Sequence, residues 1–346
     1  MAEEREVLLR VEHLKQYFKM GLGAVNKAVD DVSFEIKKGE VFGMVGESGC
    51  GKTTTGRGII KLYDITGGDV YFKGEHISSG IKEKKRKLRE LKKNGDLDGA
   101  KALEEEIARS IAEVKHAKKS HVMTKMQMIF QDPVASLNPR MTVREIIAEG
   151  LKIAGEKDKK VIEESVRNAL DMVGLVPEHA ERYPHEFSGG QRQRIGIARA
   201  IVLNPELIIA DEPISALDVS IQAQVINLLN ELRKKMGLTI MFIAHDLSVV
   251  KYFSDRIAVM YYGQMVELAD TDELFAHPFH PYTRALLSAI PLPDPNYEKQ
   301  RKRIIYEKAL AHDYSKQGPT FREIRPGHFV LCNDAEEEKY RAELNG

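Results

Sequence analysis

Stretches of alternating or continuous apolar residues fill the first third of the chain and predict β-strands. They cover residues 7–14, 32–36, 40–46 and 68–74, and turn residues separate them. The third stretch leads into the glycine-rich run GESGCGKT, and the residues after that run, TTGRGIIKLY, have helical spacing. We therefore expect a strand, a glycine-rich loop and a helix in succession.

Residues 80–120 differ from this pattern because charged side chains occupy most positions. Two thin apolar stripes run through the segment: Ile81, Leu88 and Leu91 in its first half, and Leu103, Ile107, Ile111 and Val114 in its second. Asn94 and Gly95 can end the first helix. The pattern predicts an inserted helical hairpin whose stripes pair as a short antiparallel coil. Its strongly basic first arm suits RNA or lipid headgroups, although a charge-rich helix is more often simply solvated.

Helical and strand-like stretches alternate after the hairpin. The strand MQMIFQ precedes a helical lobe at 142–173, where Pro and Gly residues mark the breaks. Past Gly190 there follow a helix, the buried strand LIIAD, a helix through Lys235, the strand TIMFIAH, a short helix and RIAVMYYGQMVELA. This alternation predicts a largely parallel α/β sheet. From about His277 the chain is Pro-rich and then basic, and we expect that part to be an appendage.

Composition narrows the classes of protein to consider. The chain has 346 residues, and its 52 Lys and Arg balance its 52 Asp and Glu, so no global field attracts nucleic acid or an acidic membrane. The start, MAEEREVLLR, lacks the apolar core of a secretory signal, and no apolar run approaches the roughly 20 residues of a spanning helix. Cys50 and Cys332 are too few for a disulfide framework or a metal cluster. We expect a cytoplasmic protein that reaches a membrane only through a partner.

The run from Gly46 to Thr53 fits the phosphate-loop pattern G-x-x-x-x-G-K-T. Its glycines let backbone N–H groups surround phosphate oxygens, Lys52 reaches the β- and γ-phosphates, and the Thr53 hydroxyl can hold Mg²⁺. The loop predicts a nucleoside triphosphatase and leaves kinases, GTPases and motor ATPases open. The expected nucleotide-binding residues are Gly46, Glu47, Ser48, Gly49, Cys50, Gly51, Lys52, Thr53 and Thr54.

The segment LIIADE supplies the acidic groups that the loop lacks. Its apolar residues predict a buried strand whose end presents Asp211 to the metal. Glu212 follows directly and is placed to polarise a water for in-line attack on the γ-phosphate. A strand that ends in a solvated acidic turn is common, so this segment alone is weak evidence for a catalytic site. Together with the phosphate loop it becomes strong evidence.

A second glycine-rich turn, FSGGQ, opens the helix QRQRIGIARAIVL. Ser188 is a plausible N-cap, and Gly189 and Gly190 permit close backbone approach to an anion at the positive helix end. One phosphate chain leaves little room for two such helix ends from the same fold. The second turn would therefore serve a nucleotide held by another copy, and a tightly packed helix cap is an equal alternative.

These motifs together resemble the ATPase subunits of ABC transporters, over nearly the whole chain. The resemblance rests on GESGCGKT, FSGGQ, LIIADEP, SALD and a His after a strand. It implies that two subunits sandwich two ATP molecules, so that each site joins the phosphate loop of one chain to the signature turn of the other. The signature turn comprises Ser188, Gly189, Gly190 and Gln191.

The resemblance also implies the architecture and several residue roles. We expect an α/β fold, a P-loop NTPase core of ABC ATPase type at 1–275 with an antiparallel β subdomain, the hairpin at about 80–120 and a helical subdomain at about 132–190. A C-terminal extension occupies 276–346. Gln131 would sense Mg²⁺ and the attacking water, His245 would contact the γ-phosphate, and the loop from Ser215 to Asp218 would contact the facing subunit. Phe18 would stack on adenine. Tyr17 is the alternative, and a purely structural aromatic in the core is the explanation without a ligand.

A narrower resemblance concerns the peptide and nickel import branch of that family. It rests on QDPVASLNPRMTV, ADEPISALDVSIQAQV, HPFHPYTRALLSAIP and RPGHFVLC. It implies an ATP-hydrolysing subunit, with ATP and Mg²⁺, that powers import of oligopeptides or dipeptides. The implied partners are a second ATPase subunit, either a copy or a paralogue, two membrane permease subunits and, indirectly, an external binding protein, at the cytoplasmic face of the membrane.

Two features depart from that branch, and other functions stay open. Many members bind an iron–sulfur cluster through a cysteine-rich loop near the C-terminus, but Cys332 cannot supply four thiolates, so we expect no cluster. The insertion at 80–120 exceeds the usual connection. Oligosaccharide import is the main alternative, followed by a nucleic-acid-associated ABC ATPase and a P-loop kinase, although we expect no nucleic acid partner.

Overall fold

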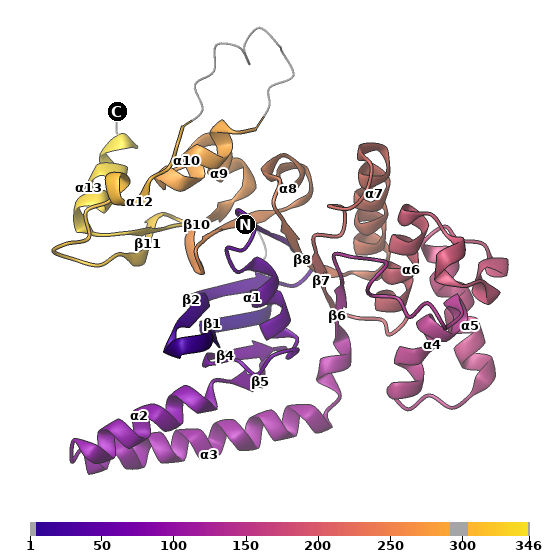
Figure 1. The fold of residues 1–346 in the computed structure, drawn as a ribbon, viewed down its shortest axis with the longest axis horizontal. Helices are drawn as coiled ribbons and strands as arrows, with labels where there is room; N and C mark the ends of the chain where they lie inside the picture. The colour runs from indigo at the N-terminus through magenta and orange to yellow at the C-terminus, as the bar shows by residue number, and fades with distance from the viewer. Residues whose placement is uncertain (1–4, 291–303, 345–346) are drawn as a thin grey trace, which may run out of the picture.

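The computed structural model describes residues 5–290 and 304–344, and these form two sheets surrounded by helices (Figure 1). The larger sheet has the strand order β11-β12-β10-β9-β3-β8-β7-β6. Its strands are β3 (Val41–Val45), β6 (Met126–Ile129), β7 (Leu207–Asp211), β8 (Thr239–Ala244), β9 (Arg256–Tyr261), β10 (Gln264–Asp270), β11 (Thr320–Arg325) and β12 (His328–Cys332). The neighbours from β9 to β6 run parallel, and β10, β12 and β11 pair antiparallel. The predicted α/β fold is confirmed.

The central strands read as continuous apolar runs because both faces of the sheet are covered. On β8, Ile240 and Phe242 belong to one hydrophobic cluster, and Met241 and Ile243 belong to another. The first cluster packs against helices, and the second fills the space toward the smaller sheet. Because both faces are packed, the positions of the strands and of the residues at their carboxyl ends are fixed.

The smaller sheet is antiparallel, with the order β2-β1-β4-β5. Its strands are β1 (Val7–Lys19), β2 (Val25–Lys37), β4 (Gly67–Phe72) and β5 (Glu75–Ser79). The sequence pattern predicts the first three, but it misses β5, which carries a buried histidine. His76 lies 2.9 Å from both Asp69 and Glu113, so ion pairs rather than apolar alternation allow its burial. Helix α1 (Lys52–Ile59) contacts β1, β2 and β7 and so lies between the two sheets.

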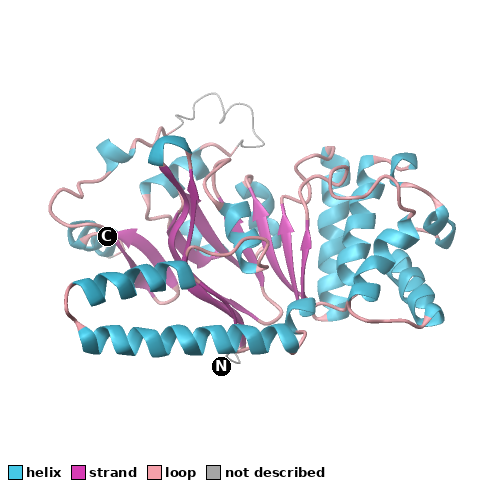
Figure 2. Cartoon of the chain, turned by 60° about the horizontal axis from the view of Figure 1, so that its bottom comes forward, coloured by secondary structure: helices cyan, strands magenta, loops and turns pink. Residues whose placement is uncertain are grey.

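The predicted helical hairpin is confirmed, and α2 (Ile81–Lys93) and α3 (Leu97–Lys119) lie side by side (Figures 1 and 2). Asn94 caps the end of α2, and Gly95 has a φ of 78°. The buried residues of α3 are Ala100, Ile107, Ser110 and Ala117, whereas the predicted stripe residue Ile111 is 46% exposed. The buried face of α3 is shifted because the helix packs on β5 as well as on α2.

A group of helices forms the lobe beside β6 and β7 (Figure 1). It contains α4 (Val143–Ile153), α5 (Lys159–Met172) and α6 (Gly189–Ile201), followed along the chain by α7 (Val219–Met236) and α8 (Leu247–Phe253). A reciprocal cap starts α4: the Glu145 N–H donates to Thr142 Oγ1, and the Thr142 N–H donates to the Glu145 carboxylate. No helix in the described ranges has the length and apolar character that crossing a bilayer requires.

The C-terminal part, which the sequence predicts to be an appendage, extends the main sheet. It contains α9 (Thr271–Ala276), α10 (Pro281–Ser288), α12 (Lys308–Ala311) and α13 (Asp334–Glu343), and its strand β12 pairs with β10. The pairing joins Glu267 and Leu268 to Val330 and Phe329, which lie about sixty positions later. Pro291, the last residue of the segment HPFHPYTRALLSAIP, lies outside the described residues.

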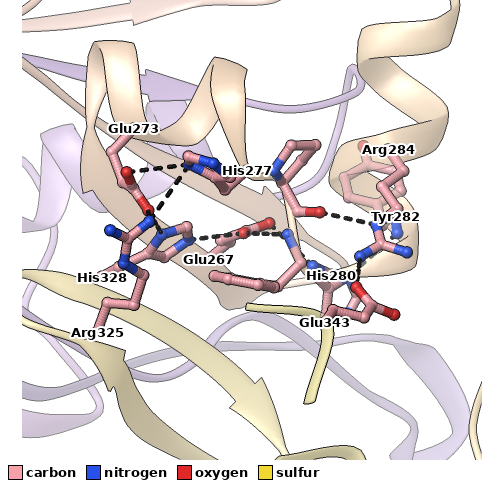
Figure 3. A network of polar contacts seen from close by, with 11 residues as sticks. Glu267, Glu273, His277, His280, Tyr282, Arg284, Arg325, His328 and Glu343 are labelled. Carbon is pink, nitrogen blue, oxygen red and sulfur yellow. Dashed lines mark hydrogen bonds and ion pairs between the residues drawn. The ribbon is translucent and has the colours of Figure 1, made fainter. Parts of the chain in front are cut away.

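A buried carboxylate on β10 joins these C-terminal elements (Figure 3). Glu267 is fully buried and accepts hydrogen bonds from the backbone N–H groups of Phe279 (2.7 Å) and His280 (3.1 Å). His328 Nε2 on β12 lies 2.8 Å from the same carboxylate. The residues before α10 and the strand β12 therefore share one anchor.

We expect Glu267→Ala to lower the free energy of unfolding by about 3–5 kcal/mol, because the change leaves buried donors without a partner. Urea unfolding followed by circular dichroism measures the effect. The matched control is Glu273→Ala, whose carboxylate contacts Arg325 and His328 but is 25% exposed, so a loss of at most about 1 kcal/mol is expected. Equal losses of unfolding free energy in both variants would show that the burial of Glu267 does not make its contacts more stabilising than those of Glu273.

Candidate nucleotide-binding site

The glycine-rich loop connects β3 to α1, as the sequence pattern predicts. Gly46 has a φ of 155°, and a Cβ atom there would lie 2.2 Å from the Met260 carbonyl oxygen. Gly51 has a φ of 110°, and a Cβ atom there would lie 2.2 Å from the Ala28 carbonyl oxygen. Both positions therefore require glycine. The residues Glu47, Ser48 and Gly49 that follow Gly46 are exposed.

Lys52, at the start of α1, is almost fully buried and is bonded within its own loop. Its ammonium group donates to the carbonyl oxygens of Gly46 (2.7 Å) and Glu47 (2.9 Å). These bonds hold the positive charge inside the curve of the loop. That placement suits a group that neutralises phosphate oxygens.

A hydroxyl and a carboxylate meet beside the loop and fit a magnesium ion. Asp211, at the end of β7, is fully buried, and its Oδ1 accepts a hydrogen bond of 2.6 Å from Thr53 Oγ1. Its Oδ2 has no hydrogen-bond partner and lies 3.7 Å from the Arg57 guanidinium. Burial raises the pKa of Asp211. Mg²⁺ is commonly bound through one or two carboxylates together with phosphate oxygens and waters, so a carboxylate with a free oxygen beside a hydroxyl fits it.

Glu212 is the meeting point of the predicted catalytic side chains. Its Oε2 accepts a hydrogen bond of 3.0 Å from Gln131 Nε2 and lies 3.4 Å from His245 Nδ1. These residues follow β7, β6 and β8, which are neighbouring parallel strands whose carboxyl ends share one edge with the end of β3. The structure therefore brings Gln131, Glu212 and His245 together. Gln131 forms no hydrogen bond with Thr53 or Asp211, the other predicted metal-binding residues, and its amide is bonded to Glu212.

The backbone of Glu212 and a small hollow beside it suit an activated water. Glu212 has a φ of 44°, an uncommon value for a residue with a side chain, and its N–H donates to the Ile243 carbonyl oxygen at 3.0 Å. A hollow of about 60 Å³ is lined by Glu212, Ser215 and His245 among others. That volume accommodates water. Glu212 therefore borders a space that a water molecule can occupy.

The signature turn begins α6, and its residues cap that helix. The Gln191 N–H donates to Ser188 Oγ (3.3 Å), and the Ser188 N–H donates to Gln191 Oε1 (3.1 Å). A Cβ atom on Gly190 would lie 2.6 Å from the Ile221 side chain, so helix packing alone requires glycine there. These contacts are those of a capped, closely packed helix start. Ser188 and Gly189 are nevertheless exposed, and α6 lies across β6 from α1 (Figure 1).

The loop from Ser215 to Asp218 connects the two parts of the site. Ser215 Oγ donates to the Glu212 carbonyl oxygen at 3.1 Å. At the other end, Leu217 faces Gly189, and the Asp218 side chain is exposed and makes no capping bond to α7. The carboxylate of Asp218 is therefore available to an approaching surface.

The aromatic residues at the end of β1 differ in their surroundings. The Tyr17 hydroxyl donates to Asp30, and the Lys27 ammonium lies 5.4 Å from the Tyr17 ring centroid. Phe18 makes an edge contact of 5.6 Å with the ring of Tyr63. Adjacent strand residues point to opposite faces, so only one of the two can serve a given ligand. Because Tyr17 is already bonded to Asp30, Phe18 remains the residue that we predict to stack on adenine.

Sequence reasoning missed three residues near this site. Arg57 approaches Asp211 from one helical turn after Thr53, a spacing that could have been noticed. Tyr63 contacts Phe18, and no sequence signal indicates it. Tyr282 lies in a segment noted only for its resemblance, and its hydroxyl accepts a hydrogen bond from the Glu47 N–H at 3.1 Å.

Comparisons with known proteins give the family of the chain. Residues 29–105 and 99–215 match the family model described as ABC transporter, and residues 266–328 match the oligopeptide/dipeptide transporter C-terminal region. The oligopeptide transport ATP-binding protein OppF of Bacillus subtilis is 56% identical over 332 residues, which cover 96% of this chain and 98% of that protein. The dipeptide transport ATP-binding protein DppF of Lactococcus lactis is 46% identical over 349 residues, covering 99% and 98%.

Solved structures resemble the same fold. A bacterial ABC transporter cassette solved as a dimer aligns with a TM-score of 0.59 at 26% identity, over 76% of this chain and 99% of that one. An ATP-binding cassette dimer in a post-hydrolysis state with bound ADP and phosphate aligns with a TM-score of 0.58 at 26% identity, over the same shares. The family match across the core, the full-length relatives and the converging motifs lead to one conclusion: the chain belongs to the ABC transporter family of ATP-binding proteins.

Proposed function

We propose that this chain is the ATP-hydrolysing subunit of a peptide importer. The observation that carries the proposal is the convergence of Gln131, Glu212 and His245 at the strand ends beside the phosphate loop. The printed names of the relatives, which are oligopeptide and dipeptide transport ATP-binding proteins, support peptides as the cargo. The match of residues 266–328 to the oligopeptide/dipeptide transporter C-terminal region supports the same cargo.

The residues of the chain divide the chemistry of hydrolysis. Backbone N–H groups of residues 46–54 and the Lys52 ammonium hold the phosphates of ATP, and Phe18 stacks on the adenine. Thr53 and Asp211 would hold Mg²⁺, which supplies positive charge to the β- and γ-phosphate oxygens when bound. Glu212 accepts a proton from the water that attacks the γ-phosphate, and ADP and phosphate are the products. Gln131 and His245 orient Glu212 and contact the water and the γ-phosphate.

A second subunit completes each site. Ser188, Gly189, Gly190, Gln191 and Asp218 are exposed or half-buried. The first four lie at the start of α6, which lies across β6 from α1, so we expect the set to act on a nucleotide held by the facing chain. The resemblance to cassettes solved as dimers supports this arrangement. ATP would then hold two subunits together, and its hydrolysis would let them separate, which couples the nucleotide to the shape of the partner.

The partners follow from this coupling. Two permease subunits would carry the peptide through the membrane, the chain would bind them peripherally on the cytoplasmic face, and an external binding protein would deliver the peptide. The facing subunit is either a second copy or a paralogue.

The test is ATP hydrolysis by the protein reconstituted with its permease subunits in lipid nanodiscs. We expect the rate to rise when the external binding protein is added with peptides and to stay low when it is added alone. Stimulation of ATP hydrolysis by oligosaccharides in place of peptides would contradict the proposal that peptides are the cargo. Stimulation by DNA that grows as the salt concentration falls would overturn import altogether.

A further inference from the structure

A hollow of about 510 Å³ lies between the inserted hairpin and the smaller sheet. Its walls come from α2, α3, β5 and the turn that follows α1. The apolar part of its lining consists of Ile65, Ile81, Ile111 and Val114. This volume lies in the range of small-molecule sites.

The polar lining of the hollow is mostly ammonium groups. Its lysines are Lys61, Lys82, Lys85, Lys115 and Lys118, against a single carboxylate, Asp64. Each pair on the hairpin is spaced by three residues, so its two members share one helix face. The protein as a whole has no net charge, so this grouping is a local concentration.

Four of these five ammonium groups have no bonded partner among the described residues. Within residues 5–290 and 304–344, the side chains of Lys82, Lys85, Lys115 and Lys118 form no hydrogen bond or ion pair. Lys61 donates to the Ile77 carbonyl oxygen at 2.9 Å, and burial together with the charge of Lys118 lowers its pKa. Crowded like charges oppose folding, and an anion in the hollow would relieve that repulsion.

We propose that this hollow binds a small phosphorylated ligand, whose phosphate oxygens contact the lysines and whose apolar part contacts the isoleucines. The ligand is either a soluble phosphate compound or the headgroup of an anionic lipid, which share this chemistry. The hollow has no aromatic side chain in its lining, whereas single-stranded RNA sites stack bases on aromatic rings. RNA is therefore the less suitable ligand. This proposal does not depend on peptide import.

The test compares two triple variants that remove equal charge from the same helices. The site variant carries Lys85→Gln, Lys115→Gln and Lys118→Gln, and the control carries Lys87→Gln, Lys101→Gln and Lys119→Gln, which are exposed and outside the lining. Inorganic pyrophosphate is titrated calorimetrically with saturating ADP, which occupies the phosphate loop. Vesicles of phosphatidylglycerol are compared with vesicles of phosphatidylcholine by flotation.

We expect the wild type to bind pyrophosphate or phosphatidylglycerol vesicles, and we expect the site variant to lose at least about tenfold in affinity. The control should stay within about twofold of the wild type, since surface charges outside the hollow contribute little. Binding of vesicles alone would identify a lipid headgroup, and binding of pyrophosphate would identify a soluble ligand. Absence of binding, equal losses in both variants, or tighter binding of a single-stranded RNA would overturn the proposal.

An independent observation concerns Tyr282 on α10, which joins the C-terminal extension to the phosphate loop. Its side chain is 1% exposed, and its hydroxyl oxygen accepts a hydrogen bond from the Glu47 N–H at 3.1 Å. Glu47 directly follows Gly46, where the loop leaves β3. Burial raises the pKa of Tyr282, so its hydroxyl stays protonated.

The position of Tyr282 is itself fixed by the network of the C-terminal elements (Figure 3). The Tyr282 N–H donates to His280 Nδ1 at 3.1 Å, and the His280 N–H donates to the buried Glu267 carboxylate. Arg284 Nε donates to the Pro278 carbonyl oxygen at 2.7 Å. Buried hydrogen bonds therefore link Glu267 to His280 and His280 to Tyr282, and the partly buried bond from the Glu47 N–H joins Tyr282 to the phosphate loop.

We infer that Tyr282 is a positioning residue, which holds the entrance of the phosphate loop in its nucleotide-binding shape. The inference rests on the proposed ATP site. Because linkage is reciprocal, a nucleotide in the loop would also stabilise the contact between α10 and the loop.

Tyr282→Phe removes the hydroxyl and keeps the ring. We expect the KM for ATP to rise about threefold to tenfold, with kcat within about twofold of the wild type, since one hydrogen bond is lost. Calorimetric titration with ADP should show the same loss. The control is Tyr261→Phe, whose ring lies 4.4 Å from that of Tyr282 and whose hydroxyl makes no hydrogen bond with the described residues.

Two outcomes would overturn the inference: an unchanged KM, or a fall in kcat and thermal stability that accompanies the rise in KM. A wild type that binds ADP but does not hydrolyse ATP would contradict the proposed function instead. The ADP titration then still decides the role of Tyr282.

Discussion

Glu212→Gln is expected to lower kcat for ATP hydrolysis by about 100- to 10,000-fold, the range for removal of a general base. The amide keeps the size of the carboxylate, and its oxygen can still accept the hydrogen bond from Gln131. The Asp211 carboxylate cannot replace it, because that group is fully buried and bonded to Thr53. ATP binding should remain, so the variant should accumulate as an ATP-bound dimer.

Steady-state ATPase assays and analytical ultracentrifugation with ATP measure the two parts of this result. Glu206→Gln is a suitable control, since Glu206 lies just before β7 at the other end of the strand and pairs with Lys73. Its turnover should match the wild type. Unchanged turnover in Glu212→Gln would remove Glu212 from the chemistry.

Ser188→Arg is expected to abolish ATP hydrolysis even though every residue of the phosphate loop is intact. Loss of a donor that stabilises charge on the reacting group costs about 100- to 1,000-fold in kcat, and the long side chain also obstructs the turn. ADP binding to the single chain should be unchanged, because Ser188 caps the start of α6, which lies across β6 from α1. The measurements are kcat for ATP hydrolysis and the affinity for ADP, each compared with the wild type.

Mixing two inactive variants tests whether the facing subunit is a second copy. Lys52→Ala has a defective loop and an intact signature turn, and Ser188→Arg has the reverse. A mixed dimer contains one site with both parts intact, so the mixture should regain part of the activity. Recovery would show that the chain pairs with itself, absence of recovery would point to a paralogue, and full turnover by Ser188→Arg alone would overturn the shared site.

Local features of the chain allowed the phosphate loop and its strand to be predicted. The glycines at 46 and 51 are required by carbonyl oxygens only 2.2 Å from an added Cβ, and such constraints appear directly as a motif. The strands β3, β7 and β8 are apolar at nearly every position because both faces are covered. The pattern of residues close together in the chain is sufficient to predict elements of this kind.

Features that depend on distant partners could not be predicted. β5 is polar, and only its contacts with Asp69 and Glu113 explain why His76 is buried. The exposure of Ile111 follows from the packing of α3 on β5, which the stripe pattern does not contain. The order of the strands brings Gln131 and His245 to Glu212, and the sequence indicated that meeting only through resemblance.

The pairing of β12 with β10 has a consequence for shortened forms of the protein. A chain ending before residue 276 would still contain every predicted catalytic group, but the outer edge of β10 would lose its neighbour. Exposed backbone along a strand invites intermolecular β-pairing and aggregation. The carboxylate of Glu267 would also lose the donors from Phe279, His280 and His328 that now surround it. The minimal catalytic cassette of this protein would therefore be insoluble unless its last strands are retained.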